Sequence, residues 1–148
     1  VRDVTLDAAY LQYPFPSSWC SYALPENLAE SMLATWRSEV ASVWPELDDD
    51  EVLLPRLFSA QLLWVWVSTW WFLPRTGESD RPIALHMPSP RRSTALVDRW
   101  RRLRTDAESS GAQEIADYAS TLVEALVDRF GAGALHLVRY PAFRTSED

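Results

Sequence analysis

The sequence contains no lysine, because all fourteen of its basic residues are arginine. Without lysine the chain cannot form a Schiff base or supply the phosphate-binding lysine of a Walker-type loop. Its one cysteine, Cys20, cannot form an intrachain disulfide, so nothing in the fold requires an oxidising compartment and a cytoplasmic location is expected. The four glycines form no phosphate-cradling loop, and no Gly-x-Ser-x-Gly nucleophile elbow occurs.

Metal-binding residues are equally scarce. The two histidines, His86 and His136, lie fifty positions apart and have neither a cysteine partner nor a second histidine one helical turn away. No run of acidic residues has the spacing of a calcium loop with its central glycine. We therefore expect no metal site and no cofactor site in this chain.

Charge and apolar content set broader limits. A net charge of −7 repels phosphate, which argues against non-specific binding to nucleic acid. An apolar content of 47% over 148 residues is enough for one substantial core, so residues 1–148 are expected to form a single domain.

The stretch Leu57–Leu73 is uncharged and holds half of the eight tryptophans. At helical spacing its apolar residues surround the whole cylinder, which predicts a central helix covered on all sides. Pro55 is expected in its first turn and Pro74 just after its end. A membrane span is the alternative, but seventeen residues is the bottom of the spanning range and the polar side chains would need partners in lipid. We expect no membrane contact.

Other segments have the period of amphipathic helices, so the sequence predicts an all-α bundle of four to five helices around the tryptophan-rich one. In the helix expected over 26–44, Glu39 falls inside the apolar arc and either pairs, lies at the edge or serves a site. After Ser89 and Pro90 a helix with an arginine-rich solvated face is expected. The remaining expected elements are a short helix near 6–11, a helix over 113–130 and an extended tail over 134–144.

Acidic residues gather immediately before the central helix. Asp48, Asp49, Asp50 and Glu51 follow one another there. Carboxylates at this position stabilise the positive end of the helix dipole, which is the structural interpretation. The alternative is that they form one wall of a site for a cationic ligand, because clustered acids attract amines.

The amino-terminal segment Asp3-Val4-Thr5-Leu6-Asp7-Ala8-Ala9 resembles the sequence that follows the metal-binding aspartate in aminoglycoside phosphotransferases and choline-kinase-like enzymes. That family segment reads Gly-Asp-Pro, two variable residues, then Asp-Leu-Ala. Asp3, Asp7 and Ala9 match at the right spacing, whereas Val4 replaces the proline and Ala8 the leucine. Tyr13-Pro-Phe-Pro and the tryptophan-rich helix extend the resemblance over nearly the whole chain.

The resemblance implies the helical carboxy-terminal lobe of a kinase-like phosphotransferase, expected to be a fragment of a larger protein. In the family, the aspartate at the position of Asp7 supports the catalytic loop through hydrogen bonds. The missing amino-terminal lobe would bind ATP and Mg²⁺ and carry the catalytic aspartate and asparagine. Asn27 is the only asparagine, and no His-x-Asp lies five residues before it. The chain alone should be inactive, and the complete protein would act on a small molecule bearing an amine or hydroxyl.

Two other functions remain open from the sequence. A self-contained helical module could bind a protein partner through an aromatic surface that includes Trp19 and Tyr22, because tryptophan and tyrosine often anchor interfaces. A membrane-associated helical protein would use 57–73 as its span.

Overall fold

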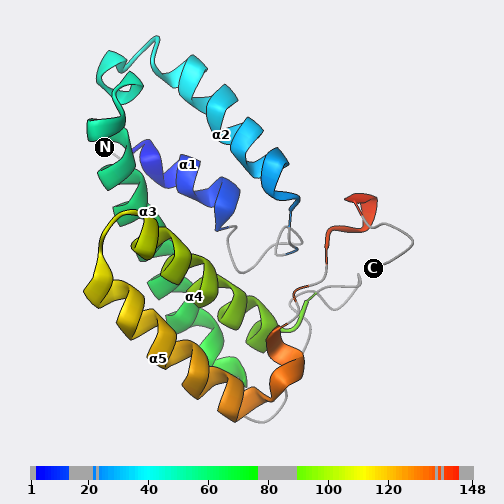
Figure 1. Ribbon diagram of the computed structural model, residues 1–148. Coiled ribbons are helices and arrows are strands. Elements are labelled where there is room, and N and C mark those ends of the chain that lie inside the picture. Colours follow the sequence, from blue (N-terminus) through cyan, green and yellow to red (C-terminus); the bar gives the residue numbers. More distant parts are fainter. Residues whose placement is uncertain are drawn as a thin grey trace.

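The computed structural model describes residues 3–13, 22, 24–76, 90–135, 137 and 139–143, and these residues form five α-helices. Figure 1 shows two antiparallel helices, α4 (Arg92–Ser109) and α5 (Gln113–Phe130), lying side by side against α3 (Asp50–Phe72). Of the other two helices, α1 (Thr5–Gln12) packs on the amino-terminal part of α3, and α2 (Glu26–Val40) packs on α1 and on the turn before α3. Single 3₁₀ turns complete the described chain: η1 Pro45–Asp48, η2 Leu73–Thr76, η3 Ala132–Leu135 and η4 Pro141–Phe143. The expected all-α bundle is confirmed.

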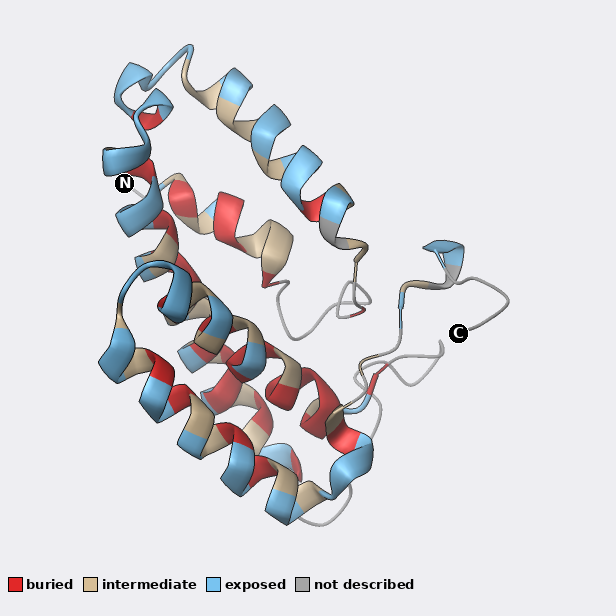
Figure 2. Cartoon of the chain, viewed as in Figure 1, coloured by how far each residue is buried: buried red, intermediate tan, exposed pale blue. Residues whose placement is uncertain are grey.

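The main core lies where α3, α4 and α5 meet. Trp100 is fully buried there, and its indole Nε1 donates a hydrogen bond of 2.9 Å to the Thr69 hydroxyl of α3. Figure 2 shows the buried residues concentrated along α4. The apolar face expected for this helix is confirmed, because each of its members is at most 2% exposed. These are Leu96, Val97, Trp100, Leu103 and Ala107.

A second, smaller cluster joins α1 to α3. Ala8 and Ala9 are fully buried against Leu57 and Ala60, and side chains this small let the two helix backbones approach closely. Two hydrogen bonds fix the register: Trp64 Nε1 donates to the Leu6 carbonyl at 2.8 Å, and the Gln61 amide donates to Gln12 Oε1 at 2.5 Å. The short helix expected near 6–11 is therefore anchored on the central helix.

The central helix begins earlier than the sequence predicted. It starts at Asp50, where the Asp49 side chain accepts a hydrogen bond of 2.9 Å from the Glu51 amide. Pro55 consequently lies inside the helix instead of in its first turn. This N-cap outweighs the proline, because a proline this close to the helix start removes only one intrahelical bond.

The expectation that α3 is covered on all sides is wrong. Leu63, Trp66 and Trp70 are 49%, 46% and 71% exposed. With Arg56 and Ser59 they form one stripe at spacings of three and four residues along the helix. The physical reason is that α1 and α4 pack on other sides of α3, and on this side, among the described residues, only the Trp66 ring contacts other helices, through Trp100 of α4 and Tyr118 of α5. We call residues 56, 59, 63, 66 and 70 the α3 stripe.

The second helix also departs from its expected packing. It ends at Val40, four residues before the expected end at Trp44, and only Leu33 and Trp36 of its apolar arc pack on the small cluster. Val43 and Trp44 are 64% and 43% exposed. Glu39 is exposed too, so its carboxylate is not buried although the residue falls inside the apolar arc.

The carboxy-terminal elements confirm the predicted bounds of the last helix and differ from the sequence prediction at two other points. The last long helix spans the expected residues, and Gly131 follows it with a φ of +85°, a conformation that favours glycine. Tyr118 was expected on the buried face but is 50% exposed. The described part of the tail contains the 3₁₀ turns η3 and η4 in place of the expected extended segment, because Pro141 and the small residues near Gly133 favour turns.

One helix, within Asp50–Thr76, is long and apolar enough to cross a membrane by length and composition alone. Its polar side chains have partners inside the bundle: Gln12 for Gln61 and the Trp100 indole for Thr69. These contacts are those of a core helix in a folded bundle.

Replacing Thr69 with valine is expected to lower the free energy of unfolding by about 1–3 kcal/mol, because the buried Trp100 N–H loses its acceptor. Thr121→Val on the exposed face of α5 is the matched control and should change stability by less than about 0.5 kcal/mol. Urea unfolding followed by tryptophan fluorescence measures both. Equal stability of Thr69→Val and the wild type would show that this hydrogen bond is dispensable.

Candidate functional site

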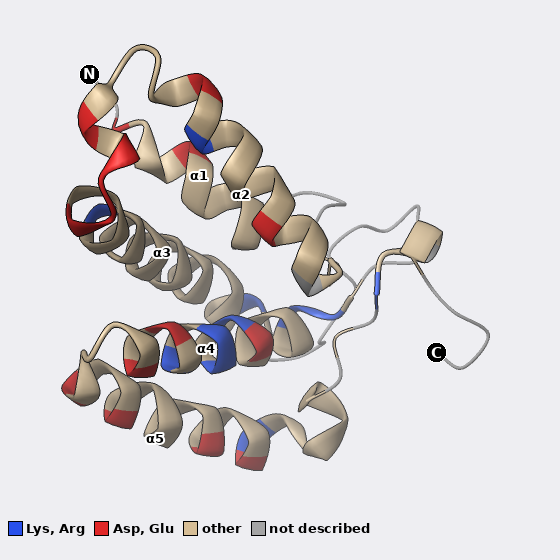
Figure 3. Cartoon of the chain, turned by 45° about the horizontal axis from the view of Figure 1, so that its top comes forward, with Lys and Arg blue, Asp and Glu red and all other residues tan. Residues whose placement is uncertain are grey.

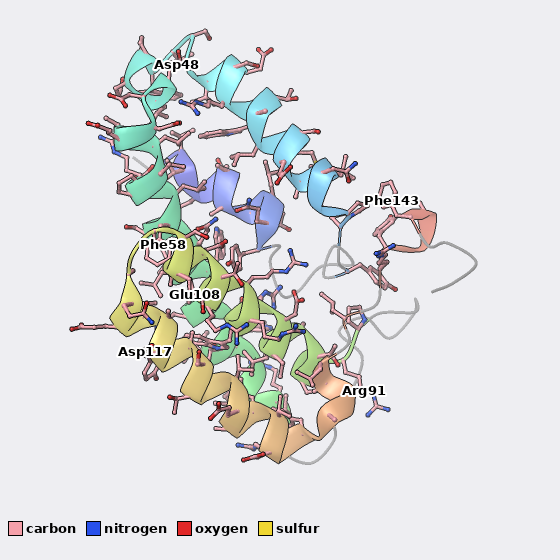
Figure 4. The ribbon with its side chains drawn as sticks, viewed as in Figure 1. Asp48, Phe58, Arg91, Glu108, Asp117 and Phe143 are labelled. Carbon is pink, nitrogen blue, oxygen red and sulfur yellow. The ribbon has the colours of Figure 1, made fainter. Side chains whose placement is uncertain are left out.

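The acidic run lies at one end of the molecule, in the turn between α2 and α3. Asp49 caps α3, while Asp50 accepts a hydrogen bond of 2.6 Å from the guanidinium of Arg37 on α2. Arg37 also donates to the Asp48 backbone carbonyl and lies 3.7 Å from the Asp48 carboxylate. Figure 4 labels Asp48 in this turn. Asp49 thus has a structural role at the start of α3, and Asp48 and Asp50 have one in the contact with Arg37 of α2.

Glu51 and Asp50 also border an open cavity of about 520 Å³. Its floor is apolar, formed by Leu54, Pro55 and Phe58 of α3, and the turn between α4 and α5 closes it on the opposite side. Glu51 is exposed and forms no salt bridge within the described part of the chain. A carboxylate beside an apolar wall suits a ligand with a cationic end and a hydrocarbon body. Of the four acidic residues of the run, Asp50 and Glu51 line this cavity.

Asp7 lies in the first turn of α1 with an exposed side chain. Next to it, an open groove of about 380 Å³ runs between the start of α1 and α3. Asp3 and Leu6 line the groove on one side, and Arg56 and Leu63 of the α3 stripe line it on the other. Asp3 provides a hydrogen-bond acceptor at the start of α1: its carboxylate accepts hydrogen bonds from the Thr5 amide and hydroxyl at 3.0 and 2.8 Å.

The sequence predicted an exposed aromatic surface that includes Trp19 and Tyr22, but Tyr22 is buried. This residue is only 6% exposed and packs edge-to-face on Tyr140, with 5.6 Å between ring centroids. Trp19 lies outside the described residues. Exposed aromatic residues do gather on α3 and α5, where Trp66 stacks on Tyr118 with 6.2 Å between ring centroids.

A polar cluster that the sequence did not predict lies on the face of α4 that meets α1 and the start of α2. Tyr13, 1% exposed, donates a hydrogen bond of 2.5 Å to the Asp106 carboxylate. One turn earlier, Arg102 forms an ion pair of 2.7 Å with Asp98. Burial raises the pKa of Asp106, although the Tyr13 hydroxyl and Arg102 act in the opposite direction. Burial and then Asp106 raise the pKa of Tyr13.

Arg99 corrects the expectation that the arginines of this helix point to solvent. It is 4% exposed, and its guanidinium lies over the Phe72 ring at 5.1 Å from the centroid. Burial lowers its pKa to about 10, so the side chain remains a cation at neutral pH. Figure 3 shows the arginines of α4 in blue among acidic residues. The sequence feature that could have indicated this cluster is the Arg-x-x-Arg spacing of Arg99 and Arg102, since it places both residues on one helix face.

Metal-ligating residues do not gather in the part of the chain that the structure describes: no group of three His, Cys, Asp or Glu side chains could hold an ion there. Cys20, His86 and His136 lie outside the described residues.

Comparison with protein-family models, with curated proteins and with solved structures found no match to this chain. Any statement about its function consequently depends on the residues and geometry described above.

The titration of the Asp106 carboxyl should change the free energy of unfolding with pH. A carboxyl whose pKa is raised by folding contributes stability below its ordinary value of 3.8 and loses that contribution as pH rises through the folded pKa. The unfolding free energy of the wild type minus that of Asp106→Asn should therefore fall as pH increases from about 4 to 7. Urea denaturation at stepped pH values measures the difference.

Asp3→Asn provides the control of opposite sign. The Thr5 backbone and side-chain hydrogen bonds lower the pKa of Asp3, so its contribution is present above 3.8 and is lost as pH falls. If both variants gave differences of the same sign, the assignment of Asp106 as the buried carboxyl would fail.

Proposed function

We propose that this chain is the helical substrate lobe of an ATP-dependent small-molecule phosphotransferase of the aminoglycoside or choline kinase type, working in the cytoplasm. The observation that carries the proposal is the uncovered α3 stripe, which continues into the groove beside α1. Contiguous exposed apolar surface of this kind marks a face that another body covers. In the proposal, that body is the lobe that binds the nucleotide.

The position of Asp7 supports this arrangement. The resemblance gives the matching aspartate the role of holding the catalytic loop, and the exposed carboxylate of Asp7 is accessible to a segment packed beside α1. A carboxylate that accepts backbone N–H bonds orders such a loop, because charge-assisted hydrogen bonds are stronger than neutral ones. In the proposal, ATP and Mg²⁺ bind to the second lobe, as the family resemblance implies.

The cavity beside Glu51 is the proposed place for the cationic end of the acceptor. Glu51 and Asp50 supply negative charge at its rim, and Leu54 and Phe58 supply the apolar wall. Arg37 already pairs with Asp50, which leaves Glu51 as the carboxylate that an amine would meet first.

Reading the coding sequence upstream of Val1 in the same frame tests the proposal directly. His-x-Asp, an asparagine five residues on and an Asp-Phe-Asp or Asp-Phe-Glu motif are expected in that order. A start codon beside Val1 would instead favour a free-standing helical protein that binds its partner through the α3 stripe. That second candidate is supported by the exposure of Trp66 and Trp70.

A protein-level measurement complements the reading of the gene. In the complete protein, Leu63→Gln combined with Trp70→Gln should lower the thermal midpoint, because both residues would be buried against the second lobe. Val43→Gln combined with Trp44→Gln is the control, since these residues are also exposed but lie away from the stripe. Equal, small effects of the two double variants would contradict a covered stripe.

Replacing Glu51 with glutamine should raise KM for an amine acceptor about ten-fold in the complete protein and leave kcat unchanged, as expected for lost ground-state binding. Glu124→Gln on the exposed face of α5 is the matched control. Steady-state phosphoryl transfer to a panel of amines measures both constants. A fall in kcat without a change in KM would remove Glu51 from the acceptor site while leaving the phosphotransferase assignment intact.

A further inference from the structure

Two connected cavities lie between α4 and the segment formed by the end of α1 and the start of α2. The inner one has a volume of about 20 Å³ and the outer one about 460 Å³. They share five lining residues, so they lie next to each other. The shared residues are Gln12, Leu24, Ala29, Asp98 and Arg102.

The inner cavity is lined by groups that donate hydrogen bonds. Arg99 and Tyr22 line it, and both are more than nine-tenths buried, at 4% and 6% exposure. The Tyr22 hydroxyl has no hydrogen-bond partner in the part of the chain that the structure describes. A buried hydroxyl without a partner costs free energy, so an acceptor bound beside it would be favoured.

Charge distinguishes the two cavities. The charged residues of the described inner lining are Arg99, Arg102 and Asp98, which leave a formal charge of +1. In the outer cavity three arginines face three carboxylates, so the charges balance there. These residues are Arg101, Arg102, Arg104, Glu30, Asp98 and Asp106. A ligand matched to both cavities has one negative group at its inner end and a polar, uncharged body.

We infer that these cavities bind a small monocarboxylate, with its carboxylate beside Arg99, Arg102 and the Tyr22 hydroxyl and its polar body in the outer cavity. A carboxylate is favoured over phosphate because the inner cavity is small, at about 20 Å³, and a planar carboxylate is smaller than a tetrahedral phosphate. The planar guanidinium fork also matches carboxylate geometry. This site is separate from the cavity at Glu51, and the inference does not depend on the proposed function.

Isothermal titration of the full 148-residue chain at fixed ionic strength tests the site, with gluconate as the probe and acetamide and inorganic phosphate as comparisons. Gluconate should bind, and acetamide should not. Tyr22→Phe should weaken gluconate about ten-fold, which corresponds to about 1.4 kcal/mol. Tyr118→Phe, where the ring is half-exposed, should leave the affinity unchanged. Arg102→Gln is a second variant that should also weaken binding.

Stability measurements separate a binding role from a structural one. Without ligand, Tyr22→Phe should be at least as stable as the wild type, because the removed hydroxyl has no described partner. With saturating gluconate the wild type should gain more in thermal midpoint than the variant. The inference is overturned if gluconate does not bind, if Tyr22→Phe binds it equally well, if phosphate binds more tightly, or if the variant is destabilised without ligand.

Discussion

The burial of Trp100 against α3 is the contact on which the rest of the bundle depends. Its indole ring reaches from α4 to the Thr69 hydroxyl and packs edge-to-face on Trp66, with 5.4 Å between ring centroids. Tyr118 of α5 packs on the same ring at 5.9 Å between centroids, so one side chain joins three helices. A large aromatic ring with a single donor gives both apolar area and a fixed orientation. The antiparallel pair of α4 and α5 is thereby held on the central helix.

Periodicity predicted the helices well because each packs apolar residues of one face against another helix. The clearest case is α5, whose two ends were both predicted correctly from its pattern and from Gly131. The start of α3 was misplaced because proline was given more weight than the capping side chain of Asp49. Local capping outweighs a single lost backbone bond, and that balance is hard to judge from spacing alone.

Periodicity did not predict in the same way which sides of a helix are covered by other helices. An apolar helix is identified by its composition, whereas the number of elements that cover it depends on how the other helices are placed in space. The sequence of α3 is apolar on all sides, yet α1, α4 and α5 leave Leu63 and Trp70 exposed. Tyr118 is half-exposed for the same reason, since one side of its ring stacks on Trp66 and the rest faces solvent.

The buried polar cluster was missed because a helix rich in arginine is usually a solvated surface. Tertiary packing decides otherwise for Arg99, since the Phe72 ring covers its guanidinium and the end of α1 lies over its neighbours. Burying a cation costs free energy unless groups that compensate its charge lie beside it. A buried arginine is therefore expected only where such groups are present, and not along a whole helix face. In this chain, Asp98, Arg102 and Asp106 accompany Arg99 on successive turns of α4, and Tyr13 closes the cluster from α1. Polar chemistry is thus concentrated where α1 and α4 meet, whereas the uncovered apolar surface lies on α3. The two faces can therefore be altered independently, because no residue of the α3 stripe lines the polar cavities.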